Sequence, residues 1–174
     1  ILQNKPNAKI ALLYQNDDFG KDYMIGLKDG LGASASKMLV ATQTYETSEP
    51  TVDSQIVSLK GSCADTLVVA AIPKFAAQSI HKVGELGWKP LFFLTNVSVS
   101  VGSVMKPAGL ENGKGIITGA YLKDPTDPTW TNDAGMKAYL AWLKKWDPAA
   151  SPTDVNAAYG YRLAQTMVQV LKQC

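Results

Sequence analysis

Two short apolar runs, separated by one segment of helix length, constrain the fold of this sequence more than any other feature. The first run is rich in Val and Leu and ends at Pro73, and the second begins at Leu91 and ends in the polar pair Thr95-Asn96. The segment between them repeats its apolar residues at helical spacing. Short apolar runs bounded by breakers are typical of strands buried on both faces. The stretch 65–96 therefore predicts two parallel strands joined by a right-handed helical crossover.

The same alternation of strand and helix runs through the first two thirds of the chain. It predicts further strands at 9–14, 38–45 and 115–121, and further helices at 21–31, 51–61 and 98–105. The expected fold class is α/β, a doubly wound five-stranded parallel sheet in the order 2-1-3-4-5. Open sheets of this kind bind ligands at the carboxyl ends of their strands. We therefore expect residues 72–74 and 95–98 to contact a small molecule.

The pattern changes at residues 123–128, where two prolines and two aspartates predict a stiff, extended connection. Beyond it we expect only helices, one from Asp133 to Trp146 and a last one that Asp154 caps. The last helix has a single apolar stripe, made of Ala157, Tyr161, Ala164, Val168 and Leu171. These helices need a partner surface, which is either the sheet or a second lobe that is missing from this chain.

Composition restricts the function classes. The 174 residues are 46% hydrophobic and 18% charged, which fits one globular domain, or one lobe of a larger protein with an extension. The net charge of +2 does not favour nucleic acid as a partner. No apolar stretch approaches the ~20 residues of a membrane span. The chain starts at Ile1 with no leader pattern and ends in helical rhythm, so we expect a fragment of a longer mature protein.

The two cysteines do not form a metal-binding pattern, because neither Cys-x-x-Cys nor any other metal spacing occurs. Cys63 falls on the apolar stripe of the helix expected at 51–61, which favours a buried thiol. A disulfide with Cys174 stays open as an alternative in an oxidising compartment. We expect no metal and no cofactor.

Catalytic motifs are also absent. The loop after the first strand, residues 16–20, carries two carboxylates and lacks the glycine pattern that lets a backbone approach phosphate. Asp17 and Asp18 are expected to cap the following helix rather than to act as acid and base. His81 is the only histidine and lies within a helix, and no Gly-x-Ser-x-Gly elbow occurs. The sequence does not predict an enzyme.

A receiver domain with a five-stranded parallel sheet is the sharpest alternative. Such domains have an acidic pair after the first strand, Thr or Ser after the fourth and Lys after the fifth, and this chain has Asp17-Asp18, Thr95 and Lys123 in those places. The third strand, however, ends in Ala70-Ala71-Ile72, without the phosphoacceptor aspartate. Phosphoryl transfer and a Mg²⁺ site would both be incomplete without it.

The order and spacing of five loose motifs give a closer resemblance. The chain resembles type I periplasmic solute-binding proteins of ABC importers, the group of extracellular ligand-binding receptors related to leucine/isoleucine/valine-binding proteins. The resemblance covers nearly the whole chain. Its motifs are Lys9-Ile-Ala-Leu-Leu-Tyr14, Asp18-Phe-Gly20, Asp53-Ser-Gln-Ile-Val-Ser-Leu-Lys60 with Ala64-Asp-Thr-Leu-Val-Val69, Val83-Gly-Glu-Leu-Gly-Trp-Lys-Pro90 and Tyr159-Gly-Tyr-Arg-Leu-Ala164.

The resemblance implies a protein of two α/β lobes that close on a ligand. Residues 1–122 would be the second lobe. Residues 123–174 would be a crossover linker followed by helices that belong to the first lobe, whose sheet is absent. This arrangement would account for helices that have no partner surface in the sequence.

The resemblance also implies where this lobe contacts its ligand: at the residue before glycine in the first loop, and at the tips of the third and fourth strands. These positions are Phe19, Ala71, Ile72, Asn96, Val97 and Ser98. Phe19 is either a ligand-stacking wall or a buried hinge anchor. Amino-acid binders of the family often carry an acidic residue near the fourth tip, but none occurs between Leu91 and Lys106.

A buried ammonium without a counter-charge is costly, so this lobe favours a ligand end that is apolar or aromatic. The expected function is the substrate-binding component of an ABC importer. It would capture a small organic solute, either branched-chain amino acid-like or an aromatic carboxylate. Its partners would be that solute and a membrane permease, with no nucleic acid and no membrane insertion of this segment. The expected location is periplasmic, or extracellular with an upstream anchor. The alternative is a ligand-sensing lobe of a receptor or transcriptional regulator.

Overall fold

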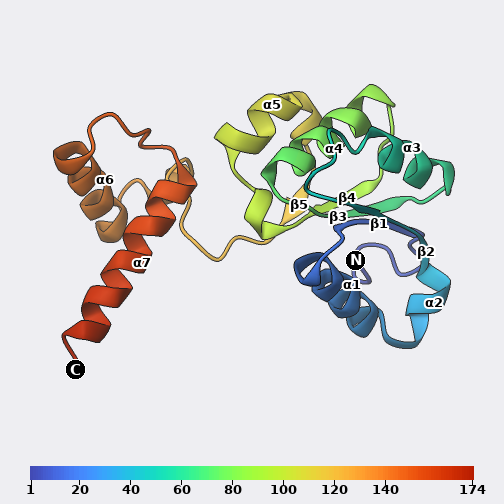
Figure 1. Cartoon of the computed structure of the whole chain (residues 1–174), viewed down its shortest axis with the longest axis horizontal. Coiled ribbons are helices and arrows are strands. Elements are labelled where there is room, and N and C mark those ends of the chain that lie inside the picture. The colour runs from blue at the N-terminus through green and yellow to red at the C-terminus, as the bar shows by residue number, and fades with distance from the viewer. The chain divides into compact units, whose positions relative to one another are not determined.

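The computed structural model describes residues 1–174, which form two compact units, Ile1–Gly119 and Ala120–Cys174. The first unit contains a five-stranded sheet in the order β2-β1-β3-β4-β5, with every pair of neighbouring strands parallel (Figure 1). Its strands are β1 (Ile10–Gln15), β2 (Leu39–Tyr45), β3 (Thr66–Ala70), β4 (Leu91–Leu94) and β5 (Ile117–Thr118). The predicted fold class and strand order are confirmed.

Helices cover both faces of this sheet. In Figure 1, α3, α4 and α5 lie on one face, and α1 and α2 lie on the other. The helices of the first unit are α1 (Asp18–Leu31), α2 (Ala35–Met38), α3 (Asp53–Gly61), α4 (Pro73–Glu85) and α5 (Lys106–Ala108). The alternating order of strands and helices explains the two-sided cover, because each crossover helix must pack back on the sheet.

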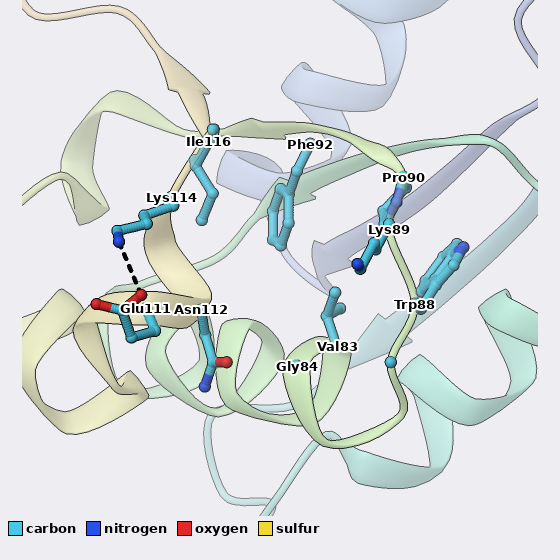
Figure 2. Close-up of a pocket in the computed structure, with 12 residues that line it drawn as sticks. Val83, Gly84, Trp88, Lys89, Pro90, Phe92, Glu111, Asn112, Lys114 and Ile116 are labelled. Carbon is cyan, nitrogen blue, oxygen red and sulfur yellow. Dashed lines mark ion pairs between the residues drawn. The ribbon is translucent and has the colours of Figure 1, made fainter.

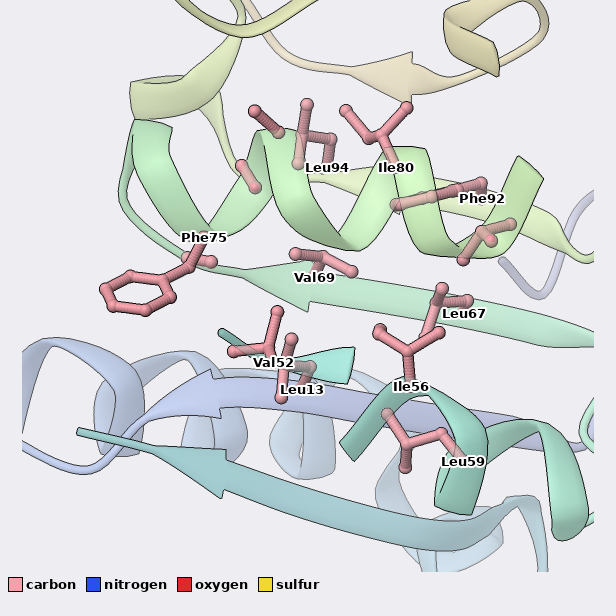
Figure 3. Packing of buried hydrophobic residues seen from close by; sticks show 14 of the residues in the cluster. Leu13, Val52, Ile56, Leu59, Leu67, Val69, Phe75, Ile80, Phe92 and Leu94 are labelled. Atoms are coloured by element: carbon pink, nitrogen blue, oxygen red, sulfur yellow. The ribbon is translucent and has the colours of Figure 1, made fainter. Parts of the chain in front are cut away.

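The larger core lies between the sheet and α3 and α4. Leu13 and Val69 point to this face and pack among Ile56, Phe75 and Ile80 (Figure 3). Ile10 points to the opposite face, where it packs with Leu31 and Met38. All five large side chains of the first face are no more than 1% exposed. Burying each side chain contributes roughly 1.5–3 kcal/mol. Packing on both faces of the sheet therefore holds β1 and β3 in place.

The helix α1 starts in unusually close contact with β1. The Asp17 side chain accepts a hydrogen bond from the backbone amide of Gly20 at 3.0 Å, as expected of a helix cap. A Cβ atom on Gly20 would lie 1.9 Å from the backbone oxygen of Gln15. The polar loop expected at 16–20 is shorter than predicted, because the helix begins at Asp18 instead of at about Lys21.

The prediction for Cys63 was wrong, because the helix α3 ends at Gly61. Cys63 lies in the turn that leads to β3, with a positive φ of 58° and an exposed side chain. Its thiol is free, and so is that of Cys174. Cys63 continues the helical spacing of the apolar residues before it, but the helix itself ends at Gly61.

Two further boundaries differ from the sequence-based expectations. The fifth strand pairs only at Ile117–Thr118, not over 115–121. After β4 the chain forms a 3-10 turn at Asn96–Ser98, a π-helical turn at Val101–Met105 and then α5, which contains Pro107. The single helix expected at 98–105 is therefore replaced by these shorter pieces, and Pro107 fits the first turn of α5 because a proline there lacks only an amide that needs no partner.

The second unit contains α6 (Ala134–Trp146) and α7 (Val155–Leu171). Asp154 caps α7 as expected, and Asp133, which was expected to be the first residue of its helix, is the cap of α6. Its core is small, with Met136, Tyr139, Leu143 and Ala158 as its buried members. The far end of the predicted stripe on α7 is uncovered, since Val168 is 50% and Leu171 is 66% exposed. Tyr161, nearer the start of the stripe, packs on the core of this unit, so only the far end is without a partner surface here.

We predict that replacing Gly20 by alanine lowers the free energy of unfolding by about 3 kcal/mol or more, because the new methyl group would overlap rigid backbone. Gly26 lies in the same helix with open space around it, so Gly26→Ala is a matched control that should raise stability by about 0.5–1 kcal/mol. Urea denaturation followed by circular dichroism measures both. Equal effects of the two substitutions would contradict the close approach at Gly20.

Candidate functional site

The carboxyl ends of the central strands meet at one edge of the sheet. Gln15 at the end of β1 pairs with Tyr45, and Val69 near the end of β3 pairs with Leu94. The predicted site residues follow these ends directly. Phe19 lies in the first turn of α1, Ile72 is the N-cap of α4, and Asn96 begins the 3-10 turn after β4. We refer to this edge, with residues 15–23, 45, 71–75 and 95–98, as the carboxyl edge.

The six predicted ligand residues differ in exposure. Phe19, Ile72 and Asn96 are half-buried, and Val97 is 44% exposed. Ala71 and Ser98 are instead fully buried, and the Ser98 hydroxyl donates a hydrogen bond to the Ala71 carbonyl at 2.6 Å. That bond ties the tips of β3 and β4 together. Of the six, Phe19, Ile72, Asn96 and Val97 therefore form the surface of the carboxyl edge. Ala71 and Ser98 lie beneath it.

A buried tyrosine joins the tips of three strands. The hydroxyl of Tyr45 donates to the side-chain oxygen of Gln15 at 2.9 Å and accepts the backbone amide of Ile72 at 3.1 Å. Burial raises the pKa of Tyr45 to about 12. The hydrogen bond from the Ile72 amide lowers it in part, and the charge of Asp17 raises it by a smaller amount. Tyr45 thus fixes Ile72 relative to β1 and β2 without reaching the surface itself.

A second tyrosine joins α1 to the tip of β4. Thr95 donates a hydrogen bond through its hydroxyl to Tyr23 at 2.6 Å, and Tyr23 donates to the side-chain oxygen of Asn96 at 2.9 Å. The ring of Tyr23 also contacts Phe19 edge-on, with 5.2 Å between ring centroids. Phe19 and Asn96, which lie on different loops, are therefore held by the same side chain.

The charged groups of the carboxyl edge are arranged unevenly. The Asp17 carboxylate accepts the Gly20 amide and the side-chain amide of Gln15, and these bonds lower its pKa. Its charge is thus engaged within the loop. Lys74 donates to the backbone oxygen of Glu49 at 3.1 Å and lies over the ring of Phe75, but it forms no ion pair.

Sequence reasoning missed Tyr23, Tyr45 and Gln15 as parts of this edge. Tyr45 had a usable signal, because it is the last residue of a strand and follows an alternating run. Tyr23 had none, since its hydroxyl contacts residues more than seventy positions away. Only the fold brings these groups together.

A cavity of about 360 Å³ lies at the opposite edge of the sheet, at the amino ends of β4 and β5. Figure 2 shows Phe92 and Ile116 pointing into it, with Lys89 at one rim and the ion pair of Lys114 and Glu111, at 2.8 Å, at the other. Trp88 is held there by a hydrogen bond to the Ala64 carbonyl. The sequence analysis predicted no site at this edge.

No helix combines the length and the apolar character needed to cross a bilayer. No group of three or more His, Cys, Asp or Glu side chains is placed to hold a metal ion.

Comparison with protein families gives one match over the full chain. A family model described as "Periplasmic binding protein" matches residues 1–174. A search of curated proteins gave no match.

Solved structures share this fold at low sequence identity. An extracellular ligand-binding receptor from Verminephrobacter eiseniae matches 98% of this chain and 47% of its own, with 19% identity and a TM-score of 0.78. A fatty acid ABC transporter substrate-binding protein from Thermomonospora curvata matches 91% and 41%, with 20% identity and a TM-score of 0.68. An amino acid ABC transporter substrate-binding protein from Pseudomonas fluorescens matches 87% and 39%, with 15% identity and a TM-score of 0.64. The chain spans half or less of the length of each.

We predict that Tyr45→Phe lowers the free energy of unfolding by about 1–3 kcal/mol, because it leaves the Gln15 oxygen and the Ile72 amide without their partner. Tyr14 is in the neighbouring strand and its hydroxyl makes no hydrogen bond, so Tyr14→Phe should change stability by less than about 0.5 kcal/mol. Urea denaturation of the two variants tests this. A Tyr45→Phe variant as stable as the native chain would show that the bonds of Tyr45 do not matter for folding.

The same tyrosine predicts a loss of stability at high pH. Its pKa is about 12 in the folded chain and near 10 when unfolded, so its contribution is complete below pH 10 and is lost as the pH rises toward 12. The difference in urea midpoint between native chain and Tyr45→Phe should therefore shrink between pH 10 and pH 12. A difference that stays constant over this range would contradict the raised pKa.

Proposed function

This chain belongs to the periplasmic binding protein family, and we propose that it supplies one lobe of a solute-binding protein that serves an ABC importer. The observation that carries the proposal is the carboxyl edge, where loops from three strands present partly exposed side chains on a rigid, hydrogen-bonded base. Ligands of open parallel sheets bind at this edge. The proposed role is capture of a solute, without chemistry performed on it.

We propose that residues 1–122 form the second lobe and that residues 123–174 are the crossover and helices of the first lobe. Two observations support this division. The chain separates into compact units at Gly119 and Ala120, and it spans half or less of the solved structures that share its fold. The exposed stripe on α7 would then pack on the sheet of the first lobe, which lies outside this chain.

The proposed ligand wall consists of Phe19, Ile72, Asn96 and Val97. Ala71 and Ser98 take part from below, where their buried hydrogen bond holds the tips of β3 and β4 in place. The contact of Phe19 with Tyr23 leaves it half-buried, which suits a stacking surface for a flat or apolar part of the solute. Closure of the two lobes would bury this wall and the solute together.

The proposed solute is a small organic molecule, either branched-chain amino acid-like or an aromatic carboxylate. The named relatives bind an amino acid in one case and a fatty acid in another, so relatives of this fold take solutes of different chemistry. The partner would be a membrane permease, and the location would be the periplasm or the outer face of an anchored protein. A ligand-sensing lobe of a receptor or regulator would use the same edge, and a fused signalling or DNA-binding segment would identify it.

We predict that this chain alone binds solute weakly or not at all, because half of the walls are absent. The two-lobe protein should bind its solute at micromolar concentration or below. A thermal-shift screen of the two-lobe protein against amino acids and aromatic acids finds the solute, and calorimetry on both forms measures the affinities. Micromolar binding by the 174-residue chain alone would show that one lobe is sufficient.

A further inference from the structure

The starting observation is the chain of hydrogen bonds from Thr95 through Tyr23 to Asn96. Tyr23 has one hydroxyl hydrogen, and its oxygen already accepts the hydrogen of Thr95 at 2.6 Å. Its own hydrogen goes to the side-chain oxygen of Asn96, 2.9 Å away. Thr95 also approaches the same Asn96 oxygen at 3.5 Å. The hydrogen of Tyr23 therefore favours the carbonyl end of the amide on the protein side, while the single hydrogen of Thr95 is already given to Tyr23.

The orientation of Asn96 determines what it presents to the solvent side. With the carbonyl oxygen held by Tyr23, the amide nitrogen lies on the opposite side of the group. This nitrogen makes no hydrogen bond within the chain, and Asn96 is half-buried at the carboxyl edge. An amide nitrogen has two donor hydrogens and no acceptor. It can pair with a carboxylate or carbonyl oxygen, but not with an ammonium group.

The charges at the tips of β3 and β4 favour the anionic partner. No acidic residue occurs between Leu91 and Lys106, and the Asp17 carboxylate is engaged by Gly20 and Gln15. Lys74, beside Ile72, has no ion pair. Asp18 and Asp22 are exposed on α1, on another side of the carboxyl edge. At the tips of β3 and β4, a carboxylate would meet donors and an unpaired positive charge, while an ammonium would meet no counter-charge from those two tips.

We infer that Tyr23 is a positioning residue that turns the Asn96 amide hydrogens toward the ligand, so that this lobe selects the carboxylate end of a solute. The inference rests on the proposed function and adds which end of the solute this lobe contacts. A branched-chain amino acid-like solute would have to place its carboxylate here, and its ammonium group against the first lobe. An aromatic carboxylate can pair with the Asn96 amide directly, because it has no ammonium group to place elsewhere.

Three probes with one phenyl ring and different polar groups test the selectivity in the two-lobe protein. Benzoate should bind at least about tenfold more tightly than benzylamine, with neutral benzamide between them, as measured by competition calorimetry. Tighter binding of benzylamine would overturn the inference. If the protein binds only a larger solute, a crystal structure of that complex decides: an oxygen should face the Asn96 nitrogen, and an ammonium there would overturn it.

Two substitutions separate positioning from simple structural support. Tyr23→Phe should weaken carboxylate binding about tenfold and leave binding of a purely apolar analogue such as toluene unchanged. Asn96→Asp keeps the bond from Tyr23 but presents an acceptor, so it should reverse the order of benzoate and benzylamine. Tyr159→Phe, which removes an exposed hydroxyl without a hydrogen bond, is the control and should change nothing. Equal losses for all three probes in Tyr23→Phe would indicate a structural role alone.

The orientation itself can be tested without any ligand. In nuclear Overhauser spectra of the labelled chain, the Asn96 side-chain amide protons should show no contact with the Tyr23 ring and should exchange rapidly with water. A strong contact with slow exchange would mean that the amide is reversed, and the inference would fail even if the protein binds solutes. If no solute in the screen binds the two-lobe protein, the proposed function fails instead, whatever the amide orientation.

Discussion

The burial of β1 and β3 on both faces is the constraint on which the rest of the structure depends. Their side chains alternate between the core under α3 and α4 and the core under α1 and α2, and neither strand can shift by one residue without exchanging the two sets. A parallel register fixed in this way also fixes where each strand ends. The position of the carboxyl edge is therefore a consequence of core packing.

Hydrogen bonds from side chains then convert this edge from three separate loops into one surface. Tyr45 connects β1 and β2 to the start of α4, Tyr23 connects α1 to the end of β4, and Ser98 connects the ends of β3 and β4. Each of these groups is buried or half-buried, where an unpaired partner would be costly. The loops are consequently held in one arrangement before any solute arrives, which lowers the entropic cost of binding.

The sequence predicted the sheet, its strand order and the loops of the carboxyl edge, because apolar runs and breakers report burial and chain direction locally. It did not predict that Ala71 and Ser98 are fully buried, since exposure at a strand tip depends on which neighbour covers it. Cys63 was misplaced because periodicity does not show where a helix ends. Tyr23 was missed because its partners, Thr95 and Asn96, are adjacent to it only in the folded chain.

The second unit shows the limit of what local structure can stabilise. Its caps at Asp133 and Asp154 form as their residues dictate, and Lys123 joins the connection to α6 through an ion pair with Asp133. Its buried cluster nevertheless contains only four residues, and large apolar side chains along α7 remain exposed. Helix caps contribute about 1 kcal/mol each, much less than the burial of an apolar helix face. The exposed apolar side chains of α7 therefore contribute little to the stability of the second unit, which depends on the small cluster around Tyr139.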